Sequence, residues 1–219
     1  MALGLGQRVG RLFVRIGVTL MPYFPLPQEW YRSILAKDSE KRYASGRWDY
    51  LADISESHRY SLIIGCADFY KPRERAVLDV GCGEGILQKR MAYTRYVGVD
   101  VNAEAIRRAQ PRVTANTEFH LAPGESFEPT GTFDVIVFNE ALYYIPQPLA
   151  VFERYRRYLK ADGIMIVCNF QTNLARRIGQ GIPRGGMIEL TSSRLSNEHG
   201  FASVVQVYAN TLLQPPKDA

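Results

Sequence analysis

From residue 76 onward, short apolar segments alternate with segments of helical periodicity. The apolar segments favour strands near 76–80, 95–100, 117–121, 133–138, 163–169 and 202–210, and the others favour helices near 85–93, 102–110, 148–160 and 172–180. "FDVIVFN" and "GIMIVCNF" are nearly continuously apolar, as expected of strands covered on both faces. The alternation predicts an α/β fold, with a mostly parallel central sheet and helices on both faces.

The chain of 219 residues is expected to have two parts, an N-terminal arm with a connector (1–47) and a domain (48–219). Three arginines at positions 8, 11 and 15 share one side of a possible helix in residues 1–27, and apolar residues share the other. Such a helix suits an anionic membrane surface, or it packs on the domain or on a partner subunit. Helical spacing in 48–70 predicts a helix that caps the domain.

The charge, the lengths of the apolar runs and the cysteines limit the possible functions less strictly than the motifs do. The net charge of +5 and the pI near 9.1 raise nucleic acid, an anionic membrane or an acidic substrate as partners, although many soluble proteins share such values. No apolar run reaches the length of about 20 residues that a membrane span needs. The three cysteines are far apart and form no C-x-x-C pair, so we expect reduced thiols, no metal site and a cytoplasmic location.

A glycine-rich loop follows the first predicted strand. "AVLDV" ends directly on Gly81, and Gly83 and Gly85 complete a G-x-G-x-G pattern that lets the backbone turn sharply and approach a ligand. The dinucleotide fingerprint would place its third glycine where Ile86 stands, and no Gly-Lys-Ser/Thr of a phosphate loop follows. By itself the loop also fits a purely structural turn.

Two acids narrow the choice of ligand. Asp100 closes the second predicted strand, where its carboxylate can accept hydrogen bonds from ribose hydroxyls. Asp79 lies inside the apolar first strand, and burying it is costly unless a donor or a cation meets it. This acid would repel a pyrophosphate and attract an ammonium group. The pattern favours a cationic nucleoside, with a dehydrogenase as a minor alternative.

Four segments carry a family resemblance. "VLDVGCGEGIL", "YVGVDVN", "FDVIVFNEALYYI" and "LKADGIMIV" resemble successive motifs of the class I S-adenosylmethionine-dependent methyltransferases, in order, across roughly residues 75–170. "NEALYYI" is similar to the small-molecule branch that includes the nodulation-factor N-methyltransferases. The resemblance implies a Rossmann-like fold, S-adenosylmethionine as cofactor, and methyl transfer to a hydroxyl or amine of a small molecule, with a sugar or glycolipid intermediate as one option.

The same resemblance implies roles for matching positions. The loop would pass under the methionine portion of the cofactor, the two acids would hold its amino group and its ribose, and the residues after the second strand would flank the adenine. The family's frequent Asp after the third strand is absent here, so Gly124, Glu125 or Ser126 would replace it. The cofactor-binding residues so implied are Asp79, Gly81, Cys82, Gly83, Gly85, Asp100, Val101, Asn102, Gly124, Glu125 and Asn139.

Methyl transfer from a sulfonium is a direct displacement, so positioning is the main catalytic contribution. An amine must arrive deprotonated and a hydroxyl needs help in losing its proton. Glu140 is the first candidate for base or substrate anchor, followed by Tyr143, Tyr144 and His120. Packing explains the two tyrosines equally well, and a histidine in a strand is often a satisfied core residue.

Other residues and functions stay open. Trp48, Tyr50 and Arg59 could touch the methionine carboxylate or the substrate, and Arg176, Arg177 and Arg184 could meet a phosphate or carboxylate or be solvated. An RNA or protein methyltransferase and a non-catalytic S-adenosylmethionine-binding subunit are the alternatives. No appended RNA-binding module and no N/D-P-P-Y/F motif is seen, so nucleic acid is the less favoured partner. Monomer and homodimer are equally compatible with the sequence.

Overall fold

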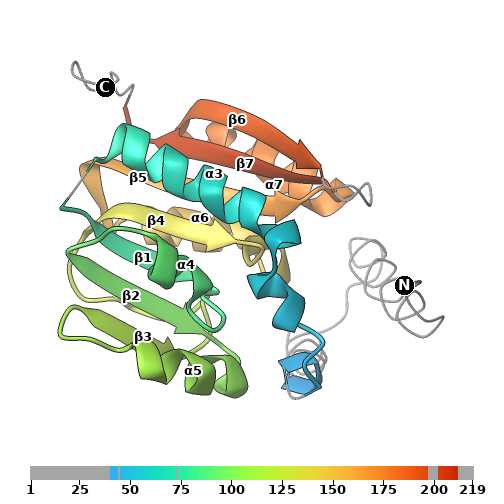
Figure 1. Cartoon of the computed structure of the whole chain (residues 1–219). Helices are drawn as coiled ribbons and strands as arrows, with labels where there is room; N and C mark the ends of the chain where they lie inside the picture. The colour runs from blue at the N-terminus through green and yellow to red at the C-terminus, as the bar shows by residue number, and fades with distance from the viewer. Residues whose placement is uncertain (1–39, 44, 73, 197–201, 212–219) are drawn as a thin grey trace.

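The computed structural model describes residues 40–43, 45–72, 74–196 and 202–211, which form a sheet between two layers of helices (Figure 1). The seven strands have the order β3-β2-β1-β4-β5-β7-β6. Strands β1 to β5 are parallel, and β7 runs antiparallel to both of its neighbours. Their bounds are β1 Ala76–Val80, β2 Arg95–Asp100, β3 Thr117–Leu121, β4 Phe133–Asn139, β5 Leu159–Phe170, β6 Ile188–Ser196 and β7 Ala202–Ala209.

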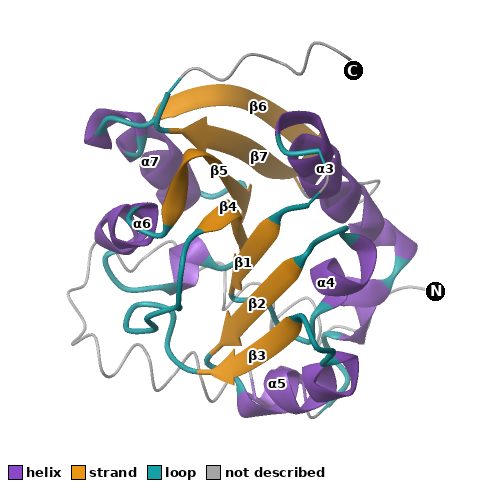
Figure 2. Cartoon of the chain, turned by 90° about the vertical axis from the view of Figure 1, so that its left-hand side faces the viewer, coloured by secondary structure: helices purple, strands orange, loops and turns teal. Residues whose placement is uncertain are grey.

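Helices cover both faces of the sheet (Figure 2). One face carries α3 (Ile54–Tyr70), α4 (Ile86–Arg90) and α5 (Ala103–Ala109), and the other carries α6 (Pro148–Arg156) and α7 (Asn173–Gly181). Short 3-10 helices are η2 (Asp49–Ala52), η3 (Gln110–Arg112), η4 (Leu142–Tyr144) and η5 (Pro183–Gly185). The predicted α/β class, with a mostly parallel sheet between helices, is confirmed.

Alternation along the strands divides the core in two. Val77 and Ile166 pack in the cluster that contains the α3 residues, whereas Leu78 and Val167 pack with α6 and α7. Successive side chains of a strand point to opposite faces, so each central strand must be apolar on both sides. This requirement explains why the unbroken apolar runs of β4 and β5 identify the middle of the sheet.

Predicted and observed elements differ in three places. β5 begins at Leu159, earlier than expected, because Leu159 pairs with Phe133 before an irregularity in the register, and α6 therefore ends at Arg156. Strand β6 was not predicted: it lies at the edge of the sheet, and none of its residues is buried. The predicted helix 48–70 is divided by the extended residue Asp53 into η2 and α3.

The predicted N-terminal arm, residues 1–27, lies outside the described residues, as does most of the connector to 47. Among the helices that the structure describes, none is both long and apolar enough to cross a membrane. All three cysteines, Cys66, Cys82 and Cys168, are free thiols.

Candidate functional site

The strand order reverses between β1 and β4, where the crossovers turn from one side of the sheet to the other. In sheets of this kind a crevice forms beyond the carboxyl ends of the strands at the reversal. The loop after β1, the end of β2 and the end of β4 meet there, and they carry most of the predicted site residues.

The glycine loop has a backbone that other residues cannot easily adopt. Gly81, Gly83 and Gly85 have φ values of 81°, 56° and 76°. A Cβ at position 81 would lie 2.3 Å from the Cβ of Ala141, and one at position 83 would lie 2.8 Å from the hydroxyl of Tyr43. Both the left-handed conformation and the lack of space exclude side chains here. The loop therefore presents backbone groups to the crevice.

Beneath this loop lies a buried acid. Asp79 is 1% exposed, and its Oδ2 accepts a hydrogen bond of 2.5 Å from the hydroxyl of Tyr96. Its Oδ1 has no hydrogen-bond partner within the described chain. Burial raises the pKa of Asp79 to about 7, the Tyr96 hydrogen bond opposes the rise, and the nearby Asp100 adds to it. A donor or a cation that faces Oδ1 would therefore stabilise this carboxylate.

Asp100 ties the loop to the end of β2. Its two carboxylate oxygens accept hydrogen bonds of 2.8 Å each, one from the N–H of Gly83 and one from the N–H of Asn102. Burial raises the pKa of Asp100, and these hydrogen bonds limit the rise. Val101 is 53% exposed, whereas the Asn102 side chain caps α5 by accepting from the N–H of Ala105 at 2.9 Å. Of these two residues, Val101 is the one whose side chain is free to cover a flat ligand.

Cys82 does not present its side chain to the crevice. Its thiol is buried, and a Cβ added at Gly98 on β2 would lie 2.9 Å from its sulfur. The side chain thus fills the space between the loop and β2, and only the backbone of Cys82 remains for a ligand.

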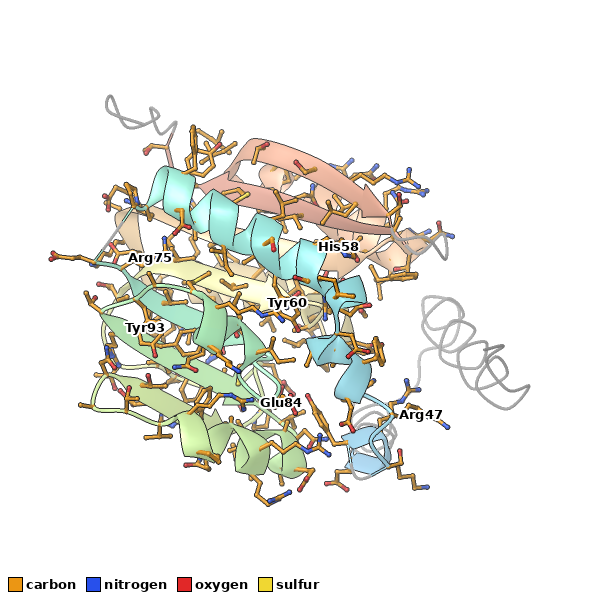
Figure 3. All side chains as sticks on the ribbon, in the orientation of Figure 1. Arg47, His58, Tyr60, Arg75, Glu84 and Tyr93 are labelled. Carbon is orange, nitrogen blue, oxygen red and sulfur yellow. The ribbon has the colours of Figure 1, made fainter. Side chains whose placement is uncertain are left out.

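Across the crevice, α3 contributes a buried cation. The side chain of Arg59 is 4% exposed. Its guanidinium donates to Asn139 Oδ1 at 3.3 Å and to the Tyr60 hydroxyl at 3.2 Å, and it lies 3.1 Å from the Glu56 carboxylate. Tyr60 lies between α3 and the sheet (Figure 3). Arg59 therefore fixes the side chain of Asn139 at the end of β4, and it is held inside the structure and not on a solvated face.

Glu140 is at the centre of a hydrogen-bond cluster. Its Oε2 accepts from the Tyr143 hydroxyl at 2.5 Å and from the N–H of Phe170 at 2.9 Å. Its Oε1 accepts from the Ser203 hydroxyl at 3.0 Å and from the Cys168 thiol at 3.7 Å. Its φ of 56° is unusual for a residue with a side chain and marks a strained position. The cluster joins the ends of β4, β5 and β7.

The other proposed catalytic residues have different positions. Tyr143 is buried beside Glu140, and burial, followed by the charge of Glu140, raises the pKa of its phenol. Its ring contacts that of Tyr144, with 4.4 Å between the ring centroids. His120 lies on β3, three strands from β4, or about 14 Å at the usual strand spacing, and is 3.2 Å from Glu118. His120 therefore lies apart from the Glu140 cluster, and its part in catalysis stays a prediction.

Two side chains of α6 form hydrogen bonds with the turn after β3. The carbonyl of Gly124 accepts from the Tyr155 hydroxyl at 2.7 Å, and that of Glu125 accepts from Arg154 Nη1 at 2.9 Å. These carbonyls therefore face α6. Contact of this turn with an adenine stays a prediction and would involve other atoms of Gly124 and Glu125.

Two tyrosines of this site were missed in the sequence. Tyr96 lies in an ordinary apolar strand, where it pairs with Val77, and its hydroxyl reaches Asp79 two residues further along β1. Tyr43 falls in a stretch that carried no pattern, yet it is 4% exposed, its hydroxyl lies above Gly83, and its ring packs edge-on against Trp48. Tyr50 is 38% exposed. No sequence signal separates Tyr43 from other residues of the connector.

Comparisons with known proteins agree with this geometry. Residues 72–197 match the model of a family described as a methyltransferase domain. A ubiquinone biosynthesis O-methyltransferase of Paraburkholderia xenovorans is 31% identical over 127 residues, which is 51% of this chain and 55% of the relative. Another, from Actinobacillus pleuropneumoniae, is 31% identical over 111 residues, or 46% of this chain and 47% of the relative. The chain spans about half the length of the curated relatives it matches.

Solved structures share the fold at low sequence identity. The N-methyltransferase NodS from Bradyrhizobium japonicum, in complex with S-adenosylhomocysteine, aligns with a TM-score of 0.68 and 18% identity over 80% of this chain and 98% of its own. The 1,6-didemethyltoxoflavin-N1-methyltransferase of Burkholderia thailandensis, with 1,6-didemethyltoxoflavin and S-adenosylhomocysteine bound, aligns with a TM-score of 0.69 and 20% identity. The alignment covers 86% of this chain and 93% of that one. These likenesses concern the arrangement of strands and helices.

Proposed function

Because the chain belongs to the methyltransferase domain family and has the class I fold, we propose that it transfers a methyl group from S-adenosylmethionine to a hydroxyl or amine of a small molecule. The observation that carries the proposal is the unpartnered Oδ1 of buried Asp79, directly beneath a loop of left-handed glycines. A ligand with an ammonium group beside a nucleoside supplies what this site lacks.

The residues present fit this donor. Asp79 would accept from its amino group, and the carboxylate of Asp100 would exchange backbone donors for ribose hydroxyls. Gly81 and Gly83 keep the loop in its left-handed conformation, so that backbone groups and no side chains would meet the donor. Val101 would cover the adenine with its exposed side chain. When bound, the donor supplies a methyl group made electrophilic by its sulfonium.

The remaining work of the chain is to place the acceptor. Asn139 and Glu140 stand at the end of β4, with Arg59 holding Asn139 in one orientation. Two of the four donors to Glu140 are hydroxyls, those of Tyr143 and Ser203. A hydroxyl can rotate away, so the carboxylate can exchange one for a proton-bearing group of an acceptor. We propose Glu140 as the base or anchor on this ground.

For the acceptor itself, two features give support. The curated relatives named above are O-methyltransferases, which favours a hydroxyl as the accepting atom. The basic, amphipathic sequence of residues 1–27 suits work at an anionic membrane surface, which favours a sugar or glycolipid intermediate.

Calorimetry with S-adenosylhomocysteine tests the donor site. We expect binding by the full chain, and binding weakened by about ten- to a hundredfold in Asp79→Asn, because a charge-assisted hydrogen bond is lost. Asp134→Asn is the matched control, since this half-buried aspartate lies at the opposite end of the sheet, where it binds Lys160 and the N–H of Ala76. Binding of NAD instead, or equal affinity in both variants, would refute the donor assignment.

The acceptor class is tested separately by transfer of radiolabelled methyl groups to a panel of hydroxylated glycolipids, amino sugars and total RNA. Transfer to the hydroxylated glycolipids supports the proposal in full. Transfer to amino sugars would keep the small-molecule acceptor and make its accepting atom a nitrogen. Transfer to RNA alone would replace the small-molecule acceptor. Tight donor binding without transfer to any acceptor would favour a non-catalytic binding subunit.

A further inference from the structure

A groove on the face of the sheet opposite to α3 is lined by residues of α7, β5, β6 and β7. Figure 2 shows α7 on that face, next to these strands. Its volume is about 450 Å³, within the range of about 300–1,000 Å³ that small-molecule sites occupy. The side chains around it are mostly amides and charged groups, among them Asn169, Gln171, Arg176, Glu189, Arg194 and Gln206.

The floor of the groove contains an unsatisfied amide. Asn169, on β5, is 3% exposed, and neither its side-chain nitrogen nor its side-chain oxygen has a hydrogen-bond partner in the part of the chain that the structure describes. Buried amides in folded proteins almost always have partners. Since Cys168 packs on the α3 side of the sheet, the next residue faces α7 and this groove. Asn169 is thus positioned for a partner that enters from the groove.

The charges at the mouth of the groove indicate the sign of that partner. Arg176 on α7 and Arg194 on β6 line it, and neither forms an ion pair with a carboxylate among the described residues. The one carboxylate of the lining, Glu189, already accepts a hydrogen bond of 2.9 Å from the side-chain amide of Gln206. Two guanidinium groups and one amide remain for an anionic group.

We propose that this groove is a binding site for a small anionic ligand, a carboxylate or a phosphate, and that it is separate from the site of the methyl donor. Asn169 donates to the anion, and Arg176 and Arg194 pair with it. Asp79 and Asn139 belong to the α3 face, whereas Asn169 belongs to the α7 face. The proposal depends on no step of methyl transfer. It also distinguishes three arginines that the sequence grouped, because Arg177 and Arg184 do not line the groove.

The test follows the side-chain amide of Asn169 by nuclear magnetic resonance in the ¹⁵N-labelled full chain, titrated with inorganic phosphate, with malonate and, at equal ionic strength, with chloride. We expect saturable shifts with phosphate or with malonate, which separates the two anion classes, and none with chloride. Arg176→Gln combined with Arg194→Gln should weaken the apparent affinity by at least about tenfold. Arg177→Gln is the matched control and should change it by less than about twofold.

Three results would overturn the proposal: no saturable shift with either anion, equal affinity in the double variant and the wild type, or loss of anion binding when S-adenosylhomocysteine is present. The last would make the groove part of the donor site. Stability gives a second measurement. Asn169→Leu should abolish anion binding and raise the urea midpoint, because an unpaired amide is removed. A lower midpoint would show that the fold needs this amide, and would refute its assignment to a ligand.

Discussion

Ionisation of Asp79 should make the ligand-free protein less stable as the pH rises. The folded state holds the proton of this acid up to a pKa of about 7, whereas 3.8 is its ordinary value. Between these values the folded protein binds more protons than the unfolded chain, so stability falls through this window and levels off above it. At 1.36 kcal/mol per pKa unit the whole effect is roughly 4 kcal/mol, and roughly 3 kcal/mol of it falls between pH 5 and pH 8.

The assay is urea denaturation of the wild type and of Asp79→Asn at pH 5, 6, 7 and 8. The variant keeps the shape of the side chain and cannot ionise, so its gain in stability over the wild type should grow by about 3 kcal/mol across the series. Tyr96→Phe should destabilise the protein, because it removes the hydroxyl whose hydrogen bond lowers the pKa of Asp79. Its loss of stability should increase with pH.

Saturating S-adenosylhomocysteine should flatten the dependence, since its ammonium group stabilises the ionised acid. A stability difference between the wild type and Asp79→Asn that stays constant from pH 5 to pH 8 would refute this reasoning. So would a difference that grows equally with and without the ligand, because the ligand would then not meet Asp79.

Four further substitutions test the geometry of the site. Gly81→Ala should abolish binding of S-adenosylhomocysteine in calorimetry and lower stability by about 1–3 kcal/mol, because its Cβ meets Ala141 at 2.3 Å in a left-handed backbone; wild-type affinity would contradict the loop geometry. Glu140→Gln should lower kcat by about a hundredfold with donor affinity unchanged, whereas Ser203→Ala should retain most turnover; equal losses would make the cluster purely structural. His120→Ala should leave kcat within about twofold of the wild type, because three strands separate His120 from Glu140, and a larger loss measured with any acceptor would support its catalytic assignment.

Much of the fold could be predicted because its central strands are buried on both faces. Such strands are apolar at most positions, and β4 and β5 are recognisable for that reason. The glycine loop was equally visible, since only glycine satisfies its backbone. β6 was not predicted, because an edge strand with no buried residue has no apolar run.

The site was predicted only as far as it is local in sequence. Asp79 and Asp100 belong to short motifs, and their places near the ends of two predicted strands indicated that they lie close together. The donors to Glu140 come from residues such as Phe170 and Ser203, which are brought close only by the pairing of β5 with β7. The separation of His120 from Glu140 was not visible in the sequence, because a position near a strand end does not show which strands are neighbours.

The reversed strand β7 also has a consequence for how the protein is made. β1 to β5 can pair with one another as the chain leaves the ribosome, at about 5–20 residues per second. Ser203, however, reaches Glu140 only when β7 has inserted between β5 and β6. A nascent chain can thus hold a formed glycine loop while the Glu140 cluster is still incomplete. The order of synthesis completes the glycine loop first and the hydrogen bonds around Glu140 last.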